Sequence, residues 1–406
     1  MFCPQFFRYL SLLHIFSLAA RLGKGRLIYK ISTRCPAIEE NILNSLNQKN
    51  ELIMNILISN SKGFGIFKKI RHLSTAGSAI MVLAIITGLV QVYANEIPSG
   101  IDIYLGDSSQ EANIYFGDPH VFTDNGIYYI YGTRNSDTGI EVYMSEDLEN
   151  WTGPAGATEG FALHRDDVYG DHGFWAPEVY RFDNRYYMFF SVERHMAIAI
   201  SDNPLGPFVQ DDKTVLADFE AIDHHLFIDD DGTYYIFFAR FDDGLKIWGA
   251  ELEEDFSAIR ENTMKLLMQR HQEWEKSSQY AVNEGPEVVK YEGRYYMLFS
   301  ANSYTNPDYG IGLAYSDHPL GPWTKVDENP ILQNPEGLAG VGHCMLFEGL
   351  DGNLYMSYHA HNDKDNVHPR KAYINPVRFV KVTEENRYTL EVLPPRMELK
   401  YRLADN

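Results

Sequence analysis

A turn-forming pair of residues followed by an aromatic-rich run recurs five times along the chain. The second residues of the five runs, all tyrosines, lie 58, 48, 61 and 59 residues apart, at Tyr129, Tyr187, Tyr235, Tyr296 and Tyr355. A β-rich run also precedes each pair, and Asn-Gly or Asp-Gly between two such runs is a strong hairpin signal. The pattern therefore predicts five β-hairpins at nearly regular spacing.

A third β-rich run follows four of the hairpins, at residues 140–145, 196–201, 245–248 and 311–316. Units of about 50–60 residues with three or four strands each are typical of β-propeller blades. We therefore predict an all-β fold, a five-bladed β-propeller, with its blades within residues 110–380. The one helix expected is an insertion in the third blade, around Glu261–Ser277.

The first 94 residues have a different pattern. A basic cluster at 68–71 precedes a twelve-residue apolar run at 79–90 and small residues that end at Ala94, as in a secretory signal peptide. We expect residues 1–94 to be an N-terminal extension and signal peptide cleaved near Ala94, and 95–406 to be the propeller domain. A translation start at Met54 would shorten the extension. The alternative is a signal anchor that stays attached, although a membrane span needs about 20 apolar residues.

The charge balance separates the same two regions. The formal net charge is −21; residues 1–94 carry 11 Lys/Arg and three Glu, which is +8 and leaves −29 for the rest. So acidic a domain argues against nucleic acid as a partner, because phosphate needs a basic footprint. Of the three cysteines only Cys344 remains after cleavage, so no intrachain disulfide is expected. We expect a secreted or periplasmic protein with no stable membrane partner after signal cleavage.

The repeats carry different side chains at the start of their first strand. These are three carboxylates, an indole and an imidazole: Asp118, Trp175, Asp223, Glu284 and His343. First strands line the axis of a propeller, so the five residues are expected at one mouth of the axial channel. Close carboxylates repel one another and cost stability. They could cap strand ends or hold an axial cation, but we interpret them as a catalytic site.

Paired carboxylates that act on a neutral polar substrate suggest glycoside hydrolysis. One is protonated and donates to the leaving oxygen, while another is ionised and activates water. A third can raise the pKa of the acid by like-charge repulsion. Tryptophan offers sugar rings an apolar face. The chain has no glycine-rich phosphate loop, His-Glu-x-x-His zinc motif or Gly-x-Ser-x-Gly elbow.

The motifs resemble those of glycoside hydrolase family 43, whose fold is a five-bladed β-propeller. They occur in the order of that family: Gly117-Asp118-Pro119, Phe174-Trp175-Ala176-Pro177, Ile222-Asp223, Glu284-Gly285-Pro286 and Gly342-His343. The resemblance implies that Asp118 is the general base, Glu284 the general acid and Asp223 the carboxylate that tunes and orients the acid. It also implies inversion, with the acid and the base about 6.5–9.5 Å apart.

The same resemblance implies further substrate-binding residues. Phe174 and Trp175 would form the hydrophobic wall of the sugar subsite, and Arg370 would point toward the sugar, unless it is a surface arginine. His343 would face a calcium ion through water, or be a buried histidine without a ligand. No cofactor is required, and Ca²⁺ on the propeller axis would be mostly water-coordinated.

Four other residues near these motifs rank lower as site residues. Glu287 is the rival for the acid, but strand alternation places it inside the first strand, away from the mouth. Glu178 is a similar decoy or a substrate contact. His120 and His224 directly follow the active-site region and could bind sugar hydroxyls.

We therefore expect an exported, inverting, exo-acting glycosidase that removes terminal α-L-arabinofuranosyl or β-D-xylosyl residues from plant polysaccharides or oligosaccharides. Segments 152–172 and 255–280 are expected to shape its pocket. The alternatives are an endo-arabinanase or galactosidase of the same family, or a non-catalytic carbohydrate-binding propeller. A retaining fructosidase of family 32 is disfavoured because its Asn-Asp-Pro-Asn-Gly signature is absent.

Overall fold

The computed structural model describes residues 111–383 and 385–402, which lie in the second of two units of the chain, Gly106–Asn406. The predicted signal peptide, with its apolar run at 79–90 and cleavage near Ala94, lies outside the described residues. Within the described residues, no helix is long and apolar enough to cross a membrane.

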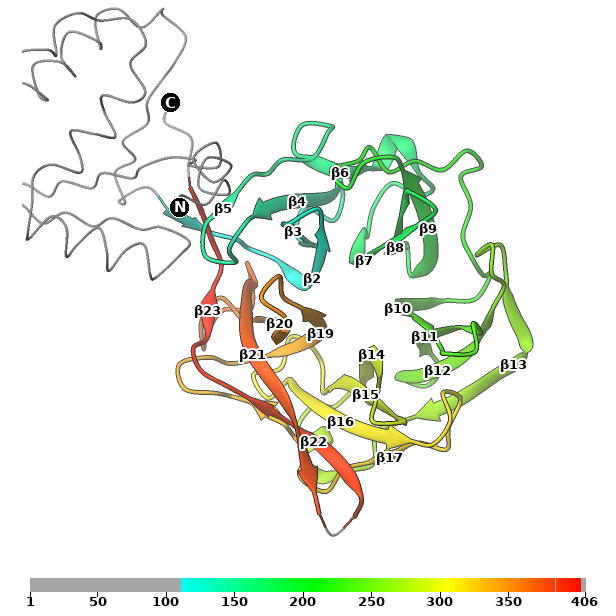
Figure 1. The fold of residues 1–406 in the computed structure, drawn as a ribbon, viewed down its shortest axis with the longest axis vertical. Helices are drawn as coiled ribbons and strands as arrows, with labels where there is room; N and C mark the ends of the chain where they lie inside the picture. The colour runs from blue at the N-terminus through cyan, green and yellow to red at the C-terminus, as the bar shows by residue number, and fades with distance from the viewer. Residues whose placement is uncertain (1–110, 384, 403–406) are drawn as a thin grey trace, which may run out of the picture. The chain divides into compact units, whose positions relative to one another are not determined.

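The strands of the described residues form five sheets around a common centre (Figure 1). The first sheet contains β1 (Glu111–Asn113), β2 (Gly117–Asp124), β3 (Ile127–Thr133), β4 (Gly139–Ser145), β5 (Trp151–Thr152), β6 (Phe161–His164) and β24 (Lys400–Arg402). The second contains β7 (Trp175–Phe182), β8 (Arg185–Val192) and β9 (His195–Ser201). The third contains β10 (Ala221–Ile228), β11 (Tyr234–Phe241), β12 (Leu245–Leu252) and β13 (Ile259–Met268).

The fourth sheet contains β14 (Asn283–Tyr291), β15 (Arg294–Ala301), β16 (Gly310–Ser316), β17 (Thr324–Lys325) and β18 (Leu332–Gln333). The fifth contains β19 (Gly342–Glu348), β20 (Leu354–Ala360), β21 (Lys371–Val382), β22 (Arg387–Val392) and β23 (Met397–Glu398). Two short 3₁₀ helices, η3 (Arg165–Asp167) and η4 (Glu273–Lys276), complete the described elements. The predicted all-β, propeller-like architecture is confirmed.

One strand of each sheet, here called its first strand, lies nearest the centre (Figure 1): β2, β7, β10, β14 and β19. β2 contacts β7, β7 contacts β10, β10 contacts β14, β14 contacts β19, and β19 contacts β2. The ring is also tied at its ends, because β1 pairs with the C-terminal strand β24, which pairs in parallel with β5. Residues far apart in the sequence are thereby brought to one axis.

The core consists of five hydrophobic clusters, each between two neighbouring sheets. Successive residues of a second strand point to opposite neighbours: Tyr129 and Tyr131 pack toward the second sheet, while Tyr128 and Ile130 pack toward the fifth. Because both faces of each sheet are covered, these strands are apolar throughout rather than alternating. This packing explains the excess of aromatic residues.

The helix predicted around Glu261–Ser277 is wrong. Residues 259–268 form β13, the outer strand of the third sheet, which pairs with β12, and only Glu273–Lys276 is helical, as the single turn η4. The ladder with β12 supplies backbone hydrogen bonds that local helical preference cannot match, since tertiary pairing overrides a weak propensity.

Candidate active site

A β-bulge interrupts the first strand of every sheet near its start. At each bulge one residue has a left-handed backbone, with φ between 45° and 56°: Asp118, Ala176, Asp223, Gly285 and His343. Bulges of this kind re-aim side chains, and non-glycine residues with positive φ concentrate at functional sites. The predicted alignment of the five repeats is therefore corrected by one residue, because Trp175 and Glu284 precede the left-handed position while the two aspartates and His343 occupy it.

Side chains from the neighbouring sheet hold these bulges in place. The backbone N–H groups of Asp118, Ala176, Asp223 and His343 donate to His359 Nδ1, Thr133 Oγ1, Ser191 Oγ and Ser300 Oγ, at distances of 3.1, 2.9, 3.0 and 2.7 Å in that order. Ala239, which pairs with Ile222 in the third sheet, stands at the position equivalent to these four acceptors, but its side chain cannot accept a hydrogen bond. The N–H of Gly285 donates instead to Asp223 Oδ2, at 3.2 Å. Asp223 is thereby tied to the backbone beside Glu284.

Asp118 is a buried carboxylate surrounded by cationic and imidazole groups. Arg370 donates from Nη1 to Oδ1 at 2.8 Å and from Nη2 to Oδ2 at 3.2 Å. Nδ1 of His343 and of His359 lie 3.3 and 3.4 Å from Oδ1. Burial opposes ionisation, but the charge of Arg370, followed by the two histidines, holds the pKa of Asp118 well below its usual range. Asp118 is therefore ionised at neutral pH, as a general base must be.

Arg370 lies against the backbone of Gly117. A Cβ at that position would lie 1.9 Å from Cζ of Arg370, so the glycine makes room for the guanidinium beside Asp118. Only 10% of the Arg370 side chain is exposed. Arg370 is therefore buried beside Asp118 rather than at the surface, and its contact with a sugar stays a prediction.

Asp223 and Glu284 have the opposite electrostatic character. Burial raises the pKa of Glu284 from 4.5 to about 7, with the Asp118 charge adding to the effect, while a hydrogen bond from Tyr309 and the charge of Arg370 oppose it. Burial also raises the pKa of Asp223 to about 7, with Glu284 and Asp118 adding and His343 opposing. Both carboxyl groups can therefore hold a proton near neutral pH. Together these three carboxyl groups, which we call the carboxylate ring, comprise one ionised group, Asp118, and two that are readily protonated, Asp223 and Glu284.

Tyr309, which lies just before β16, was not anticipated from the sequence. Tyr309 is 1% exposed, lowers the pKa of Glu284 from beside it, and stacks on His359 at a centroid distance of 5.6 Å. His359 was missed as well. Neither residue lies at the repeated first-strand position, so the repeat carried no signal for them.

The two residues predicted to form a sugar wall have different environments. Trp175 is half-buried at the start of β7. Phe174 has no exposed surface and packs against Phe190 at a centroid distance of 6.2 Å, within the cluster between the first two sheets. Phe174 is thus a core residue here, because the chain enters β7 with this side chain directed between the sheets. Of the pair, only Trp175 has surface for a sugar.

His343 lies between the two aspartates, with Nδ1 3.3 Å from Asp118 and 3.8 Å from Asp223. It offers a cation one nitrogen, and Asp118 is already bonded to Arg370. Calcium prefers six to eight oxygen ligands, so the residues around His343 do not by themselves make a calcium site. No step below depends on a metal there.

The lower-ranked residues lie away from the carboxylate ring. Glu178 and Glu287 lie two residues beyond the left-handed residues of β7 and β14 and share His225 as a partner. His120 and His224 are 4% and 1% exposed. Nε2 of His224 lies 3.2 Å from the carbonyl oxygen of Ala197, and Nε2 of His120 lies 3.0 Å from the N–H and 3.2 Å from the carbonyl oxygen of Val179. The suggestion that these histidines bind sugar hydroxyls is not supported, because both are buried.

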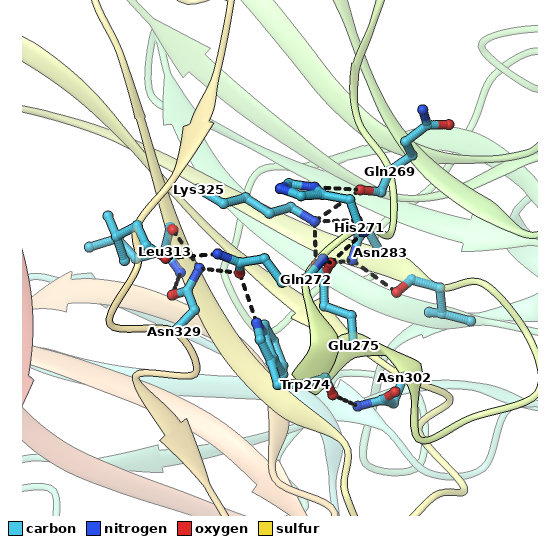
Figure 2. A network of polar contacts seen from close by, with 12 residues as sticks. Gln269, His271, Gln272, Trp274, Glu275, Asn283, Asn302, Leu313, Lys325 and Asn329 are labelled. Carbon is cyan, nitrogen blue, oxygen red and sulfur yellow. Dashed lines mark hydrogen bonds and ion pairs between the residues drawn. The ribbon is translucent and has the colours of Figure 1, made fainter.

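The segment that leads into Glu284 is anchored by a buried ion pair (Figure 2). Lys325 and Glu275 contact each other and are 2% and 0% exposed in their side chains. Lys325 also donates to Asn283 Oδ1 at 2.9 Å, while Asn283 Nδ2 donates to Glu275 at 3.1 Å. Because Asn283 immediately precedes Glu284, this network fixes the chain at the entrance to the candidate acid.

One ionised carboxylate and two protonatable ones, gathered at the centre of a propeller-like fold, indicate an enzyme of the glycosidase class. The family model described as Glycosyl hydrolases family 43 matches residues 113–381. The chain belongs to this family.

Solved and curated relatives agree with this assignment. An endo-1,4-β-xylanase from Bacteroides thetaiotaomicron has a similar structure, with 38% identity and a TM-score of 0.66 over 71% of this chain and 98% of that one. A β-D-galactofuranosidase from Aspergillus niger is 24% identical over 60% of this chain and 74% of its own length. An extracellular exo-α-(1→5)-L-arabinofuranosidase from Cellvibrio japonicus is 25% identical over 64% of this chain and 82% of its own.

Proposed function

We propose that this protein is an inverting, exo-acting glycosidase on a five-bladed β-propeller, in which Asp118 is the general base, Glu284 the general acid and Asp223 the residue that orients the acid. One observation carries the assignment: the pKa of Asp118 is held well below its usual range while that of Glu284 is raised to about 7. Two carboxyl groups whose environments shift their pKa values in opposite directions can serve as a base and an acid.

The chemistry follows from these protonation states. Glu284 gives its proton to the glycosidic oxygen as the bond from that oxygen to the anomeric carbon breaks. Asp118 takes a proton from the water that forms the new bond to that carbon from the opposite face. Arg370 keeps Asp118 ionised, and Asp223 fixes the backbone at Gly285, beside the acid. The reaction needs no cofactor.

The proposed substrates are terminal α-L-arabinofuranosyl or β-D-xylosyl residues of plant polysaccharides or oligosaccharides. Relatives with xylosidase, arabinosidase and arabinofuranosidase names support this sugar class. A galactofuranosidase and an endo-arabinanase among the relatives make those activities the first alternatives. A carbohydrate-binding propeller without activity is disfavoured, since all three carboxylates are present. Relatives described as extracellular support export.

The experiment is hydrolysis of nitrophenyl arabinofuranoside, xyloside and galactofuranoside by the wild type and by Glu284→Ala. We expect turnover of an arabinofuranoside or xyloside and its loss in the variant, with the circular dichroism spectrum unchanged. Glu273→Ala, at a side chain that is 91% exposed, is the matched control and should keep the wild-type rate. Wild-type rates in Glu284→Ala would reject the assignment. Binding of these sugars without any product would favour the binding module.

A further inference from the structure

Tyr304 is an exposed aromatic residue that lies beside the carboxylate ring. It is 38% exposed, whereas Tyr309, five residues later, is 1% exposed. The guanidinium carbon of Arg370 lies over the Tyr304 ring, 5.0 Å from its centroid, and Arg370 in turn donates to Asp118. The ring of His368 lies 5.9 Å from that of Tyr304, centroid to centroid, with 69° between the two planes. Tyr304 is thus one side chain removed from the proposed base, and the chemistry proposed above makes no use of it.

The loop that carries Tyr304, between β15 and β16, is held together by its own hydrogen bonds. Nδ2 of Asn302 donates to the carbonyl oxygen of Asp308 at 2.9 Å, which joins the two ends of the loop. Within the loop, the Asn306 N–H donates to the Ser303 carbonyl at 2.7 Å, so a turn encloses Tyr304. The backbone beneath the exposed ring is therefore fixed.

A second loop, in the fifth sheet, holds the backbone of Tyr304 as well. Nε2 of His361 lies 2.8 Å from the carbonyl oxygen of Tyr304, which can only accept, so this nitrogen carries the hydrogen. His361 is 4% exposed, and a Cβ at Gly340 would lie 2.0 Å from its Nε2, so the glycine makes room for the imidazole. An exposed ring on a fixed backbone is suited to binding, since less conformational freedom is lost when a ligand covers it.

Contact with Arg370 does not by itself account for an exposed tyrosine at this position. Arg370 is already held by two hydrogen bonds to Asp118, and 10% of its side chain is exposed. Because Arg370 covers one face of the Tyr304 ring, the exposed part of the ring belongs to its other face and its edge. Tyrosine combines an apolar ring with a hydroxyl group. The C–H groups and hydroxyls of a sugar ring match both features.

The place of Tyr304 in the fourth sheet puts it on the side of the candidate acid. Glu284 in β14 pairs with Ser300 in β15, and Tyr304 follows Ser300 by four residues, in the loop that leaves β15 at the same end of the sheet. The oxygen that an acid protonates in this reaction belongs to the leaving group. The reacting sugar would lie between Asp118 and Glu284, and the departing sugar beyond Glu284, over the fourth sheet.

We propose that Tyr304 forms the subsite for the sugar ring on the leaving-group side of the scissile bond, with the exposed face of its ring stacked on that sugar and His368 beside it. The inference rests on the glycosidase function proposed above and adds a specificity-determining residue to it. A leaving group that is itself a sugar ring covers the tyrosine, whereas a small alcohol does not reach it. The protein therefore acts on disaccharides and longer chains in preference to glycosides of small alcohols.

The test compares kcat/KM for the wild type, Tyr304→Ala and Tyr304→Phe on a disaccharide, which is xylobiose, or arabinobiose if the nitrophenyl panel selects an arabinofuranoside. We expect Tyr304→Ala to lower kcat/KM by about 10-fold, mainly through KM, and Tyr304→Phe, which keeps the apolar face, to retain about half of the wild-type value or more. Leu350→Ala is the matched control, at an exposed apolar residue in the turn after β19, 47% exposed, and should match the wild type. Should Tyr304→Ala fail to fold, Tyr304→Leu takes its place with the same expected result.

Inhibition by the released monosaccharide separates the two subsites. Free xylose or arabinose reports the reacting subsite, so its inhibition constant should be the same in Tyr304→Ala as in the wild type. If that constant rises as much as KM does, and the acidic limb of the pH profile moves upward, Tyr304 acts only by holding Arg370 beside Asp118 and the proposal is overturned. An unchanged kcat/KM of Tyr304→Ala on the disaccharide would overturn it too, and would leave the glycosidase assignment intact. Failure of the wild type to hydrolyse any of these substrates would instead reject that assignment, and this inference with it.

Discussion

Replacing Gly117 by alanine would remove the space that the Arg370 guanidinium occupies. The new Cβ would lie 1.9, 2.0 and 2.3 Å from Cζ, Nη2 and Nε of Arg370. These atoms belong to the flexible end of a long side chain, so the arginine can swing away and the fold should survive. The substitution therefore disturbs the site rather than the fold, because Asp118 loses the two hydrogen bonds that Arg370 donates.

The size of the effect follows from those two contacts. A hydrogen bond to a charged group contributes about 1.5–3 kcal/mol, and about 1.36 kcal/mol corresponds to one pH unit in a titration. Arg370 opposes the effect of burial on the pKa of Asp118, so its displacement raises that pKa. Losing even one of the bonds should move the acidic limb of the pH profile of kcat/KM upward by about one to two pH units. Misplacement of the base and the sugar should also lower kcat by about 100-fold.

The assay is the pH dependence of kcat/KM for the wild type, Gly117→Ala, Arg370→Ala and the double variant. The reasoning requires that the double variant be no worse than Arg370→Ala, because the alanine acts only through the arginine. Glu273→Ala is the control, since its side chain is 91% exposed. An unshifted acidic limb in Gly117→Ala, or full additivity of the two changes, would refute the role given to Arg370.

Two further predictions concern the acid and its support. Burial raises the pKa of Glu284 to about 7, so the protonated form prevails below pH 7 and is lost above it. The value of kcat/KM should therefore fall as the pH rises through about 7. Glu284→Gln, measured on a nitrophenyl substrate whose leaving group needs little protonation, should lack this basic limb of the pH profile. A persistent limb in that variant would point to Asp223, whose pKa is also raised to about 7. Lys325→Ala leaves Glu275 as an unpaired buried charge and should lower the free energy of unfolding by about 3–5 kcal/mol in urea titrations. The control Lys276→Ala, at a side chain that is 45% exposed, should change that free energy by less than about 1 kcal/mol. Equal losses in the two variants would contradict the importance given to the buried pair.

The parts of the fold that depend on local chemistry were predictable. Turn pairs such as Asn125-Gly126, which has positive φ at both residues, determine a hairpin by themselves. Repetition of that unit then indicated the sheets, their order and the strand starts that carry Asp118, Asp223 and Glu284.

What the sequence could not reveal depends on contacts between distant residues. β13 was mistaken for a helix because its partner β12 decides its conformation. Phe174 adjoins the motif tryptophan, yet only the packing of two sheets shows that it faces the core. Tyr309 reaches the site from the residue before β16 and His359 from β20, where no repeated motif marks them. The bulges shifted the alignment by one residue, which counting along the repeats could not detect.

The most direct test of the central claim is proton NMR of the first sugar released from the substrate of the panel that is hydrolysed fastest. With Asp118 activating water on the face opposite the leaving group, the first product should have the inverted anomeric configuration, β-arabinose from an α-L-arabinofuranoside. Release of the retained anomer before mutarotation would contradict the account, since it would require a carboxylate to attack the sugar as a nucleophile.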